Sequence, residues 1–456
     1  MPGDITLLYS VSRIGALDFY HVILIANSVF SFVIVTKLRQ ITDAQNWPAG
    51  KVTTASIRIY CRRRFRRRVN CQAFGNFWRL DVFDSNKSAN RCSLISIWPR
   101  YPTIYEINTR AWLFDLGEKT GHSVDLRSVP SSEWDGIAAY GFDAVWLMGV
   151  WQRSPSSIAI SNRNNSLLDE FKRALPDFQP RDNIGSAYSV RGYSVDEALG
   201  GPEGLSIARH ELAERGIRLI LDFVPNHVAL DHPWVCEHPE YFIDGGPSDA
   251  NNQPQSFVEL NGRIFAFGRD PYFPPWRDVL QLNAFDPRLR QAAIETIVNI
   301  ASQCDGVRCD MAMLLLNSIF EQTWGSRAGL KPATEYWADL IAAIKSAPRE
   351  FLFIAEAYWD REWELQQQGF DFCYDKRFYD RLAHGNAESV RAHLSAPVDY
   401  QSKLLHFIEN HDEQRAAAAF PLHKQRPAAV AMATVRVQDC FMRDSSRDGR
   451  YEYLSF

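Results

Sequence analysis

The sequence predicts an α/β protein built on a closed (β/α)8 barrel, the TIM barrel. From about residue 101 onward, short apolar runs alternate with amphipathic stretches. Strands that are separated by helices imply right-handed crossovers and a parallel sheet. Eight such strands within about 330 residues are what one closed barrel of this kind requires.

The expected strands are short and mostly apolar. They are Thr103–Asn108, Ala144–Met148, Arg218–Val224, Gly306–Met311, Phe351–Ala355, Asp371–Tyr374, Lys403–Ile408 and Ala428–Val435. Amphipathic helices are expected between them, among them Gly204–Arg215, Pro287–Gln303 and Glu335–Ser346. The barrel is therefore assigned to residues 101–435.

One connection is too long for an ordinary loop between a strand and a helix. Residues 228–285 show no strong period and contain many Pro, Gly, Asn and aromatic residues. Loops of this length are uncommon unless they serve a function. We therefore expect an inserted subdomain after the third strand, in which Tyr272, Phe273 and Trp276 are candidates to line a substrate cleft.

The overall composition is that of a soluble globular protein with a sizeable core, at 46% hydrophobic and 23% charged residues. A net charge of −4 provides no field that would favour nucleic acid or an anionic membrane as a partner. The 8 cysteines include no CxxC pair and no metal-ligand spacing. Cys309 and Cys373 lie in apolar runs, so buried free thiols and a reducing cytoplasm are expected.

The first hundred residues differ from the rest and carry no catalytic motif. Phe19–Val35 is 17 residues long without Asp, Glu, Lys or Arg, the bare minimum for a membrane span. Six arginines surround Phe65 and would suit phosphate or anionic lipid. We expect residues 1–100 to be a disordered segment, or an extension from a start codon placed too early. A membrane-anchored protein is the weakest alternative.

Polar residues follow the predicted strands at the barrel face where active sites lie. They are Asp222, Asn226 and His227 after the third strand, Arg308 and Asp310 on the fourth, Glu356 at the end of the fifth, and Glu409, Asn410, His411 and Asp412 after the seventh. Asp and Glu also cap helices, so a single carboxylate has an ordinary structural explanation. Carboxylates from four strands at one face are harder to explain in this way.

The carboxylates have the properties that glycosidic bond cleavage requires. Carboxylates that are buried together repel one another, so the pKa of one of them rises, as a general acid beside a nucleophile needs. Arg308 precedes Asp310 by two residues and shares its strand face, so it is expected to keep Asp310 ionised. Two carboxyl groups with different pKa values in an aromatic-rich cleft indicate a glycosidase.

Four segments resemble the signature regions of the α-amylase superfamily, in the same order. They are LDFVPNH (Leu221–His227), GVRCDMA (Gly306–Ala312), FIAEAYW (Phe353–Trp359) and FIENHD (Phe407–Asp412). The resemblance runs from about Ile104 to about Val435, some three quarters of the chain.

The resemblance implies a role for each matching residue. Asp310 matches the nucleophile, Glu356 the general acid/base, and Asp412 the carboxylate that binds ring hydroxyls and favours the distorted transition state. The matching substrate-site residues are Arg308 beside the nucleophile, His227 and His411 at the innermost sugar, Tyr188 as the ring stacked on that sugar, and Asp222 as a structural carboxylate.

Two departures from the family pattern concern substrate preference and calcium. Many starch-degrading members have Lys-His where this chain has Met313 and Leu314, so polar contacts on the leaving-group side are missing. Asn226 matches a calcium ligand of some members, although an Asn there can also simply hold the loop. We therefore expect chemistry without a cofactor, with a structural calcium ion as an option.

The segment 436–456 is too short for the last helix and the β-sandwich that the family normally carries. Codons can be chosen for Arg436–Gly449 that give PGARLLHEGQFEGR in another frame, which resembles family members after strand eight. We hypothesise a frameshift near Val435, and resequencing the DNA across that codon tests it.

These observations predict a retaining glycoside hydrolase that acts on α-glucosidic bonds of α-glucans or oligosaccharides. Two alternatives stay open. One is a transglycosylase of the glucanotransferase or sugar isomerase type, which differs only in acceptor access. The other is an inactive, truncated product that folds poorly, because an open barrel would expose strand edges.

Overall fold

The computed structural model describes residues 98–347 and 350–434, together with the strands at 6–13, 18–27, 30–39, 56–59 and 438–442. The chain divides into two units, Met1–Asn90 and Arg91–Phe456. The first contains an antiparallel sheet in the order β1-β2-β3-β4. Its strands are β1 (Thr6–Arg13), β2 (Asp18–Asn27), β3 (Phe30–Arg39) and β4 (Ser56–Ile59).

The apolar stretch Phe19–Val35 falls mainly on β2 and β3, which pair antiparallel, and not on the helix that a single membrane span would need. Across the part of the chain that is described, every helix is too short or too polar to cross a bilayer. The arginine run around Phe65 lies outside the described residues.

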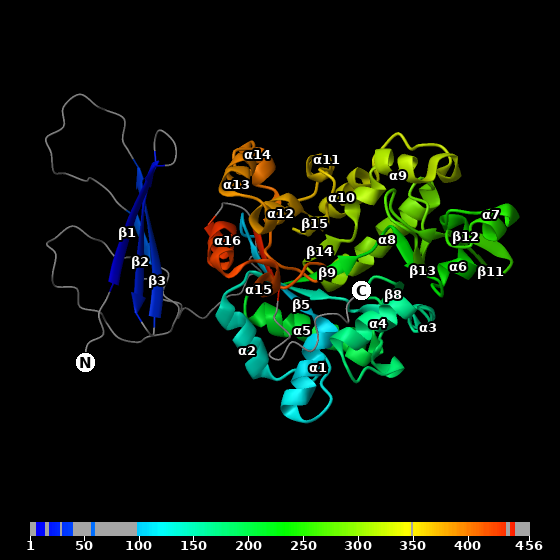
Figure 1. Ribbon diagram of the computed structural model, residues 1–456, viewed down its shortest axis with the longest axis horizontal. Helices are drawn as coiled ribbons and strands as arrows, with labels where there is room; N and C mark the ends of the chain where they lie inside the picture. The colour runs from blue at the N-terminus through cyan, green and yellow to red at the C-terminus, as the bar shows by residue number, and fades with distance from the viewer. Residues whose placement is uncertain are drawn as a thin grey trace, which may run out of the picture. The chain divides into compact units, whose positions relative to one another are not determined.

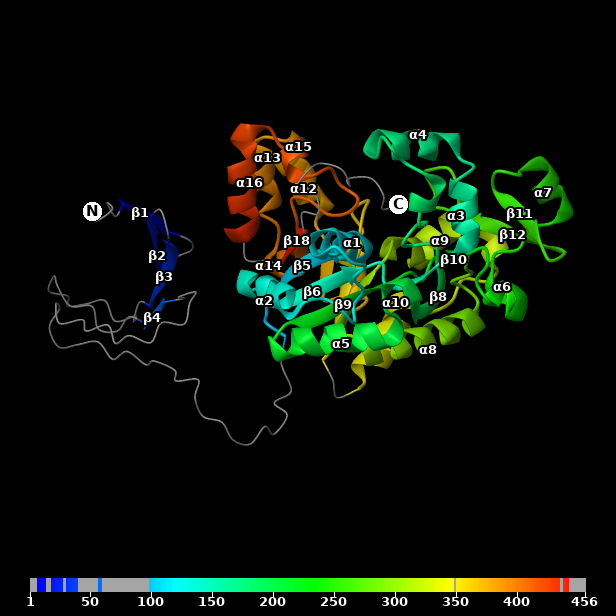
Figure 2. The same cartoon turned by 90° about the horizontal axis from the view of Figure 1, so that it is seen from below.

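In the second unit, eight parallel strands close into a barrel (Figures 1 and 2). In chain order they are β5 (Thr103–Asn108), β6 (Ala144–Met148), β9 (Arg218–Phe223), β14 (Gly306–Cys309), β15 (Leu352–Ala355), β16 (Phe372–Tyr374), β17 (Leu404–His406) and β18 (Gln438–Met442). The first seven confirm the sequence-based assignments. The barrel closes because β18 pairs with both β17 and β5.

The eighth strand assigned from sequence, Ala428–Val435, was wrong. Residues Leu422–Thr434 form helix α16, and β18 lies further on, inside the segment 436–456 that received no assignment. Four alanines favour the helix although Pro427 lies within it. Lys424 fixes α16 to the end of α12 (Lys376–His384), since its Nζ donates to the carbonyl oxygen of Gly385 at 2.9 Å.

Helices surround the barrel, and further segments interrupt the alternation at two places. The outer helices are α1 (Thr109–Thr120), α2 (Ser131–Tyr140), α5 (Gly201–Glu214), α8 (Pro287–Gln303), α9 (Asn317–Trp324), α10 (Tyr336–Lys345), α11 (Glu362–Gln367), α12, α13 (Ala387–His393), α14 (Val398–Gln401), α15 (Ala416–Ala419) and α16. Between β6 and β9 lie β7 (Trp151–Arg153), α3 (Pro155–Ser161), α4 (Asn165–Ala174) and β8 (Val190–Val195). Strands β7 and β8 pair antiparallel, and the sequence analysis did not predict either strand.

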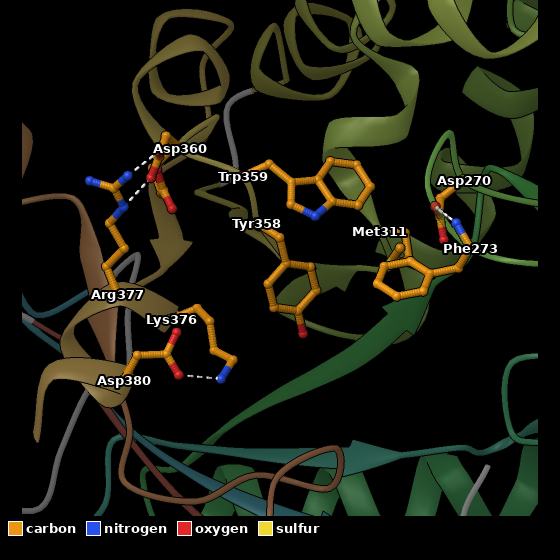
Figure 3. Close-up of a pocket in the computed structure, with 10 residues that line it drawn as sticks. Asp270, Phe273, Met311, Tyr358, Trp359, Asp360, Lys376, Arg377 and Asp380 are labelled. Carbon is orange, nitrogen blue, oxygen red and sulfur yellow. Dashed lines mark hydrogen bonds and ion pairs between the residues drawn. The ribbon is translucent and has the colours of Figure 1, made fainter. Parts of the chain in front are cut away.

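The long connection after β9 has structure of its own. It contains β10 (His227–Ala229), α6 (Trp234–Glu237), α7 (Pro247–Asn252), β11 (Phe257–Leu260), β12 (Arg263–Gly268) and β13 (Trp276–Gln281). The four strands form an antiparallel sheet in the order β10-β13-β12-β11. In this insertion Phe273 lines a cavity together with Met311 and Tyr358 (Figure 3), and the Trp276 ring lies 5.3 Å from that of His227.

Aspartates at the starts of barrel strands fix the pairing of neighbours. Asp143 accepts a hydrogen bond from the backbone N–H of Thr103 at 2.8 Å, and Asp305 accepts one from Leu219 at 3.0 Å. Asp371 accepts one from Phe353 at 2.9 Å. If a strand shifted by one residue against its neighbour, every side chain on it would turn to the other face of the sheet. These hydrogen bonds therefore help to set which residues point into the barrel.

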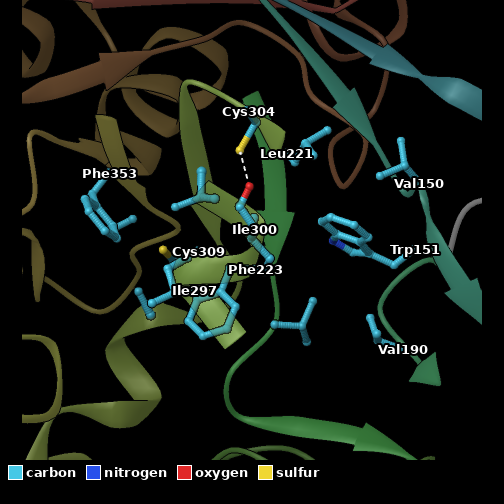
Figure 4. Packing of buried hydrophobic residues seen from close by; sticks show 14 of the residues in the cluster. Val150, Trp151, Val190, Leu221, Phe223, Ile297, Ile300, Cys304, Cys309 and Phe353 are labelled. Carbon is cyan, nitrogen blue, oxygen red and sulfur yellow. Dashed lines mark hydrogen bonds between the residues drawn. The ribbon is translucent and has the colours of Figure 1, made fainter. Parts of the chain in front are cut away.

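Side chains alternate between the barrel interior and the layer under the helices. Leu221 of β9 and Cys309 of β14 pack outward against Ile297 and Ile300 of α8 (Figure 4). The residues between them on each strand face inward. Since Cys309 points outward, both Arg308 and Asp310 face the barrel axis.

Trp337 of α10 connects the outer layer to the loop that follows β14. It is fully buried, and its indole N–H donates to the carbonyl oxygen of Ala312 at 2.8 Å. We predict that Trp337→Ala lowers the free energy of unfolding by about 3–5 kcal/mol, because it leaves a cavity and an unpaired carbonyl group. Urea unfolding followed by circular dichroism measures this.

The matched control is Trp363→Ala on α11, whose side chain is 47% exposed. A change for Trp337→Ala as small as that of the control would contradict the assigned packing role.

Candidate active site

Period-two alternation on neighbouring strands delivers the charged groups to one end of the barrel. On β14 it turns Arg308 and Asp310 inward, and on β15 it does the same for Glu356, which follows the strand directly. Asp222 is an inward residue of β9, paired directly with Arg308 in the sheet. All four are buried. The sequence-based prediction that these residues meet agrees with their positions in the structure.

The Arg308 guanidinium group lies at the centre of the cluster. One of its terminal nitrogens is 2.7 Å from Asp310 Oδ1, and the other is 2.8 Å from Glu356 Oε2. Asp222 and Asp412 are each 4.0 Å from it. Its Nε–H donates to the Tyr374 hydroxyl oxygen at 3.2 Å. A single cation therefore bridges the two carboxyl groups that sequence assigns to the chemistry.

Aromatic rings complete the surroundings of Arg308. The Tyr188 ring lies 5.0 Å from the guanidinium carbon, and the rings of Trp146 and Tyr374 lie 5.4 and 5.6 Å from it. Burial lowers the pKa of Arg308, but the nearby carboxyl and phenol groups, Glu356 foremost, outweigh it and raise the pKa well above its usual value. Arg308 therefore remains a cation throughout the working pH range.

Glu356 is in the environment of a general acid. Burial is the largest cause that raises its pKa, Arg308 opposes it, and the neighbouring Asp310 and Asp412 add to it; together they bring the pKa to about 7. Its Oε1 accepts a hydrogen bond from the Tyr358 hydroxyl at 3.0 Å. Its Oε2 accepts one from the Met311 backbone N–H at 2.6 Å. The carboxyl group is thus held in one orientation and is part-protonated near neutral pH.

Met311, directly after Asp310, has a left-handed backbone with φ of 43°. For a residue with a side chain this conformation costs of order 1 kcal/mol or more and is found preferentially at functional sites. Here it directs the Met311 N–H toward Glu356. The backbone after the candidate nucleophile therefore helps to position the candidate acid.

His411 and Asp412 form the opposite side of the cluster. His411 Nδ1 lies 2.6 Å from Glu106 Oε1, while its Nε2 lies 2.8 Å from the Tyr188 hydroxyl and 3.1 Å from Asp412 Oδ2. Burial lowers the pKa of His411, but Asp412 and Glu106 outweigh it and raise the pKa to about 9. His411 is therefore a cation near neutral pH, with Asp412, 43% exposed, beside it.

Asp222, expected as a structural carboxylate, and His227, expected at the innermost sugar, are both buried beside the cluster. Asp222 accepts from the Trp146 indole N–H at 3.2 Å and from the Gly149 backbone N–H at 2.9 Å, and burial raises its pKa to about 6. His227 is buried with its ring 5.3 Å from that of Trp276, and burial lowers its pKa, so it is neutral at pH 7.

Asn226 does not have the surroundings of a calcium ligand. Its side-chain oxygen accepts a hydrogen bond from Gln281 Nε2 at 2.9 Å, and both residues are buried. Calcium requires six to eight oxygen ligands, several of them usually carboxylates. Within residues 98–347 and 350–434, no cluster of three or more His, Cys, Asp or Glu side chains suits a metal ion. Asn226 fits the alternative role of holding the loop to β13.

Sequence reasoning missed four residues of this site, Glu106, Trp146, Tyr358 and Tyr374. Glu106 was the most accessible to prediction, since it is a charged residue at an inward position of an otherwise apolar strand, next to Ile104 in the same alternation. The three aromatic residues could not be assigned to the site in this way, because an aromatic side chain on a barrel strand more often packs in the hydrophobic core than lines an active site.

Comparisons with known proteins agree with this geometry. The model of the family described as "Alpha amylase, catalytic domain" matches residues 120–441. Alpha-amylase MalA of Haloarcula japonica is 21% identical over 74% of this chain and 43% of its own length. A relative from Bifidobacterium longum, alpha-1,4-glucan:maltose-1-phosphate maltosyltransferase, is 27% identical over 48% of this chain and 24% of its own length. The chain thus spans less than half of either relative.

Solved structures share the fold. An alpha-amylase from Geobacillus thermoleovorans superimposes with a TM-score of 0.53 at 18% identity, covering 78% of this chain and 74% of its own. One from Lactobacillus plantarum gives a TM-score of 0.52 at 20% identity, covering 76% and 72%. With a family model that matches most of its length, the chain belongs to the alpha-amylase catalytic-domain family.

Proposed function

We propose that this chain is a retaining glycosidase that cleaves α-glucosidic bonds by double displacement. The observation that carries the proposal is the bridging Arg308, which holds Asp310 and Glu356 side by side in different environments. Retaining glycosidases need one carboxylate as nucleophile and a neighbouring carboxyl group as acid. Here Asp310 has the closest contact to the cation, while Glu356 has a pKa of about 7.

In the first step the Asp310 carboxylate attacks the anomeric carbon, forming a carbon–oxygen bond as the glycosidic bond breaks. The proton of Glu356 moves to the departing oxygen. In the second step Glu356 takes a proton from water, the water oxygen attacks the anomeric carbon, and Asp310 is released as a carboxylate. Asp412, which is 43% exposed, can bind sugar hydroxyls with contacts that strengthen toward the transition state, and the cationic His411 holds it in place. Side chains of this chain carry every step.

A transglycosylase on the same site is the second candidate function. It is supported by relatives that include both amylases and maltosyltransferases. The chemistry differs only in the second step, where a sugar hydroxyl takes the place of water. Product analysis at increasing sugar concentration separates the two, because a transglycosylase makes new glycosides as its main products, whereas a hydrolase mainly releases free sugar.

Replacement of the nucleophile is the most direct test in mutants. Asp310→Asn should lower kcat on maltooligosaccharides by about 10³-fold or more, since an amide does not form the covalent intermediate. The exposed Asp399→Asn on α14 is the matched control and should retain activity. Substantial activity in Asp310→Asn, with cooperative unfolding like that of the control, would refute the assignment.

The pH dependence should report the proton on Glu356. The acid must be protonated in the first step, so its contribution is present below pH 7 and is lost as pH rises through the pKa of about 7. A plot of kcat/KM against pH should therefore fall on its alkaline side near pH 7. Glu364→Gln, which changes a half-exposed carboxyl group of α11, should leave that limb in place. A profile that stays flat up to pH 9 would count against Glu356 as the acid.

A further inference from the structure

Glu106 is a charged side chain at a barrel position where the alternation along the strand predicts an apolar one. It is an inward residue of β5, and its inward neighbour on the same strand is Ile104. The Glu106 side chain has no exposed surface, so a substrate bound in the site does not touch it. Any effect of Glu106 on the reaction must therefore pass through another side chain.

The Glu106 carboxylate is directed at His411, which follows β17. Its Oε1 lies 2.6 Å from His411 Nδ1, a short charge-assisted hydrogen bond in which the nitrogen donates. Within residues 98–347 and 350–434, its Oε2 has no hydrogen-bond partner. A buried oxygen without a partner lowers stability, and apolar side chains often replace a buried charge without loss. Folding alone therefore does not explain a carboxylate at this position, whereas the contact with His411 does.

Both ring nitrogens of His411 face carboxylates. Nε2 lies 3.1 Å from Asp412 Oδ2 and 2.8 Å from the Tyr188 hydroxyl oxygen, while Nδ1 faces Glu106. An ionised carboxylate accepts hydrogen bonds and donates none, so each nitrogen has to carry a proton and the ring is an imidazolium. A neutral ring with its proton on Nδ1 would instead turn a lone pair toward Asp412. Glu106 therefore helps to determine whether Nε2 can hold Asp412.

Charged groups on several strands act on the His411 ring. Asp412 and Glu106 favour its cationic form. Asp222 of β9 also attracts the cation, whereas Arg308 of β14 repels it. Burial lowers the pKa of His411, but the carboxylates outweigh burial and bring the pKa to about 9. Because Glu106 contributes through its charge and through its hydrogen bond, removal of its charge should lower that pKa.

We propose that Glu106 is a positioning residue that acts through the His411 imidazolium to hold Asp412 in place for the sugar. It is not itself a catalytic residue, because it has no surface that a substrate could touch. The inference rests on the proposed function, since it concerns how one carboxylate of the same site is oriented. If Asp412 were free to turn away, it would bind the sugar less well in the transition state, so the charge of Glu106 supports the chemical step.

Glu106→Gln removes the charge and keeps the size of the side chain. It should lower kcat for maltotriose about tenfold or more, the effect of losing one hydrogen bond to a charged group, and should change KM little. The matched control, Glu118→Gln, removes an exposed carboxylate from α1 and should leave both constants unchanged. Steady-state kinetics on variants that unfold cooperatively measures the difference. A kcat of Glu106→Gln equal to that of the control would overturn the inference.

The pH profile on α-glucosyl fluoride separates a positioning role from a purely structural one. Fluoride is a weak base and leaves without a proton, so kcat/KM for this substrate should lack the limb that Glu356 sets near pH 7. The His411 cation is present below its pKa of about 9 and is lost as pH rises through that value, so the alkaline limb should lie near pH 9.

In Glu106→Gln the alkaline limb on α-glucosyl fluoride should move down by about one pH unit or more, because a charge that attracts the His411 cation is gone. Glu118→Gln should leave the limb where it is. A limb that also stays in place in folded Glu106→Gln would contradict the inference.

A double-mutant cycle tests whether the effect of Glu106 passes through His411. His411→Gln alone should lower kcat/KM for α-glucosyl fluoride. Adding Glu106→Gln to it should cause less than about a twofold further loss, because the side chain through which Glu106 acts is already gone. Losses that multiply would show two independent effects and would overturn the inference.

The unchanged protein supplies a test that does not depend on how Glu106→Gln folds. In protein with ¹⁵N-labelled histidine, the ring signals of His411, assigned by their absence from His411→Gln, should show both nitrogens protonated at pH 7. A neutral ring at pH 7 would overturn the inference and leave the proposed function intact. If the folded, unchanged protein turned over neither maltotriose nor α-glucosyl fluoride, the proposed function would fail, and the inference with it.

Discussion

The structure of the site depends on one buried cation, the guanidinium group of Arg308. It contacts Asp310 and Glu356 directly and lies 4.0 Å from Asp222 and Asp412. Without it, carboxylates would be buried together without compensation, a situation that typically costs about 3–5 kcal/mol when one partner of a buried pair is removed. With it, Asp310 and Glu356 are held beside the same cation, and burial raises the pKa of Glu356 to about 7. The contacts of Arg308 with Asp310 and Glu356 therefore both stabilise the folded protein and set the environment of the two carboxyl groups.

The barrel strand β14 positions Arg308. Because side chains alternate between the two faces of a strand, much of the site could be predicted from the sequence. Once Arg308 and Asp310 were assigned to one strand, their common inward direction followed from alternation alone. Seven strand positions could be predicted because apolar runs of strand length alternate with amphipathic helices. The carboxyl groups of Asp310 and Glu356 could be brought together because parallel strands end at one face. Family membership, from the match to residues 120–441, agrees with this reasoning.

What escaped prediction depended on contacts between segments far apart in sequence. The run Ala428–Val435 has the composition of either a buried strand or a buried helix, and packing of α16 on α12 selected the helix. Glu106 belongs to the site only because His411, 305 positions away, comes within 2.6 Å of it. Tyr272 of the insertion packs edge-on against Trp359, which follows β15, and no local sequence pattern around either residue predicts that contact.

The central claim is that Asp310 forms a covalent bond to a glucosyl group. Intact mass spectrometry after incubation with 5-fluoro-α-glucosyl fluoride, which traps retaining α-glucosidase nucleophiles, tests it most directly. The account predicts one added 5-fluoroglucosyl group, located on the peptide that contains Asp310 and absent from Asp310→Asn. An adduct on a different residue, or no adduct on a protein that shows a cooperative unfolding transition, would contradict it.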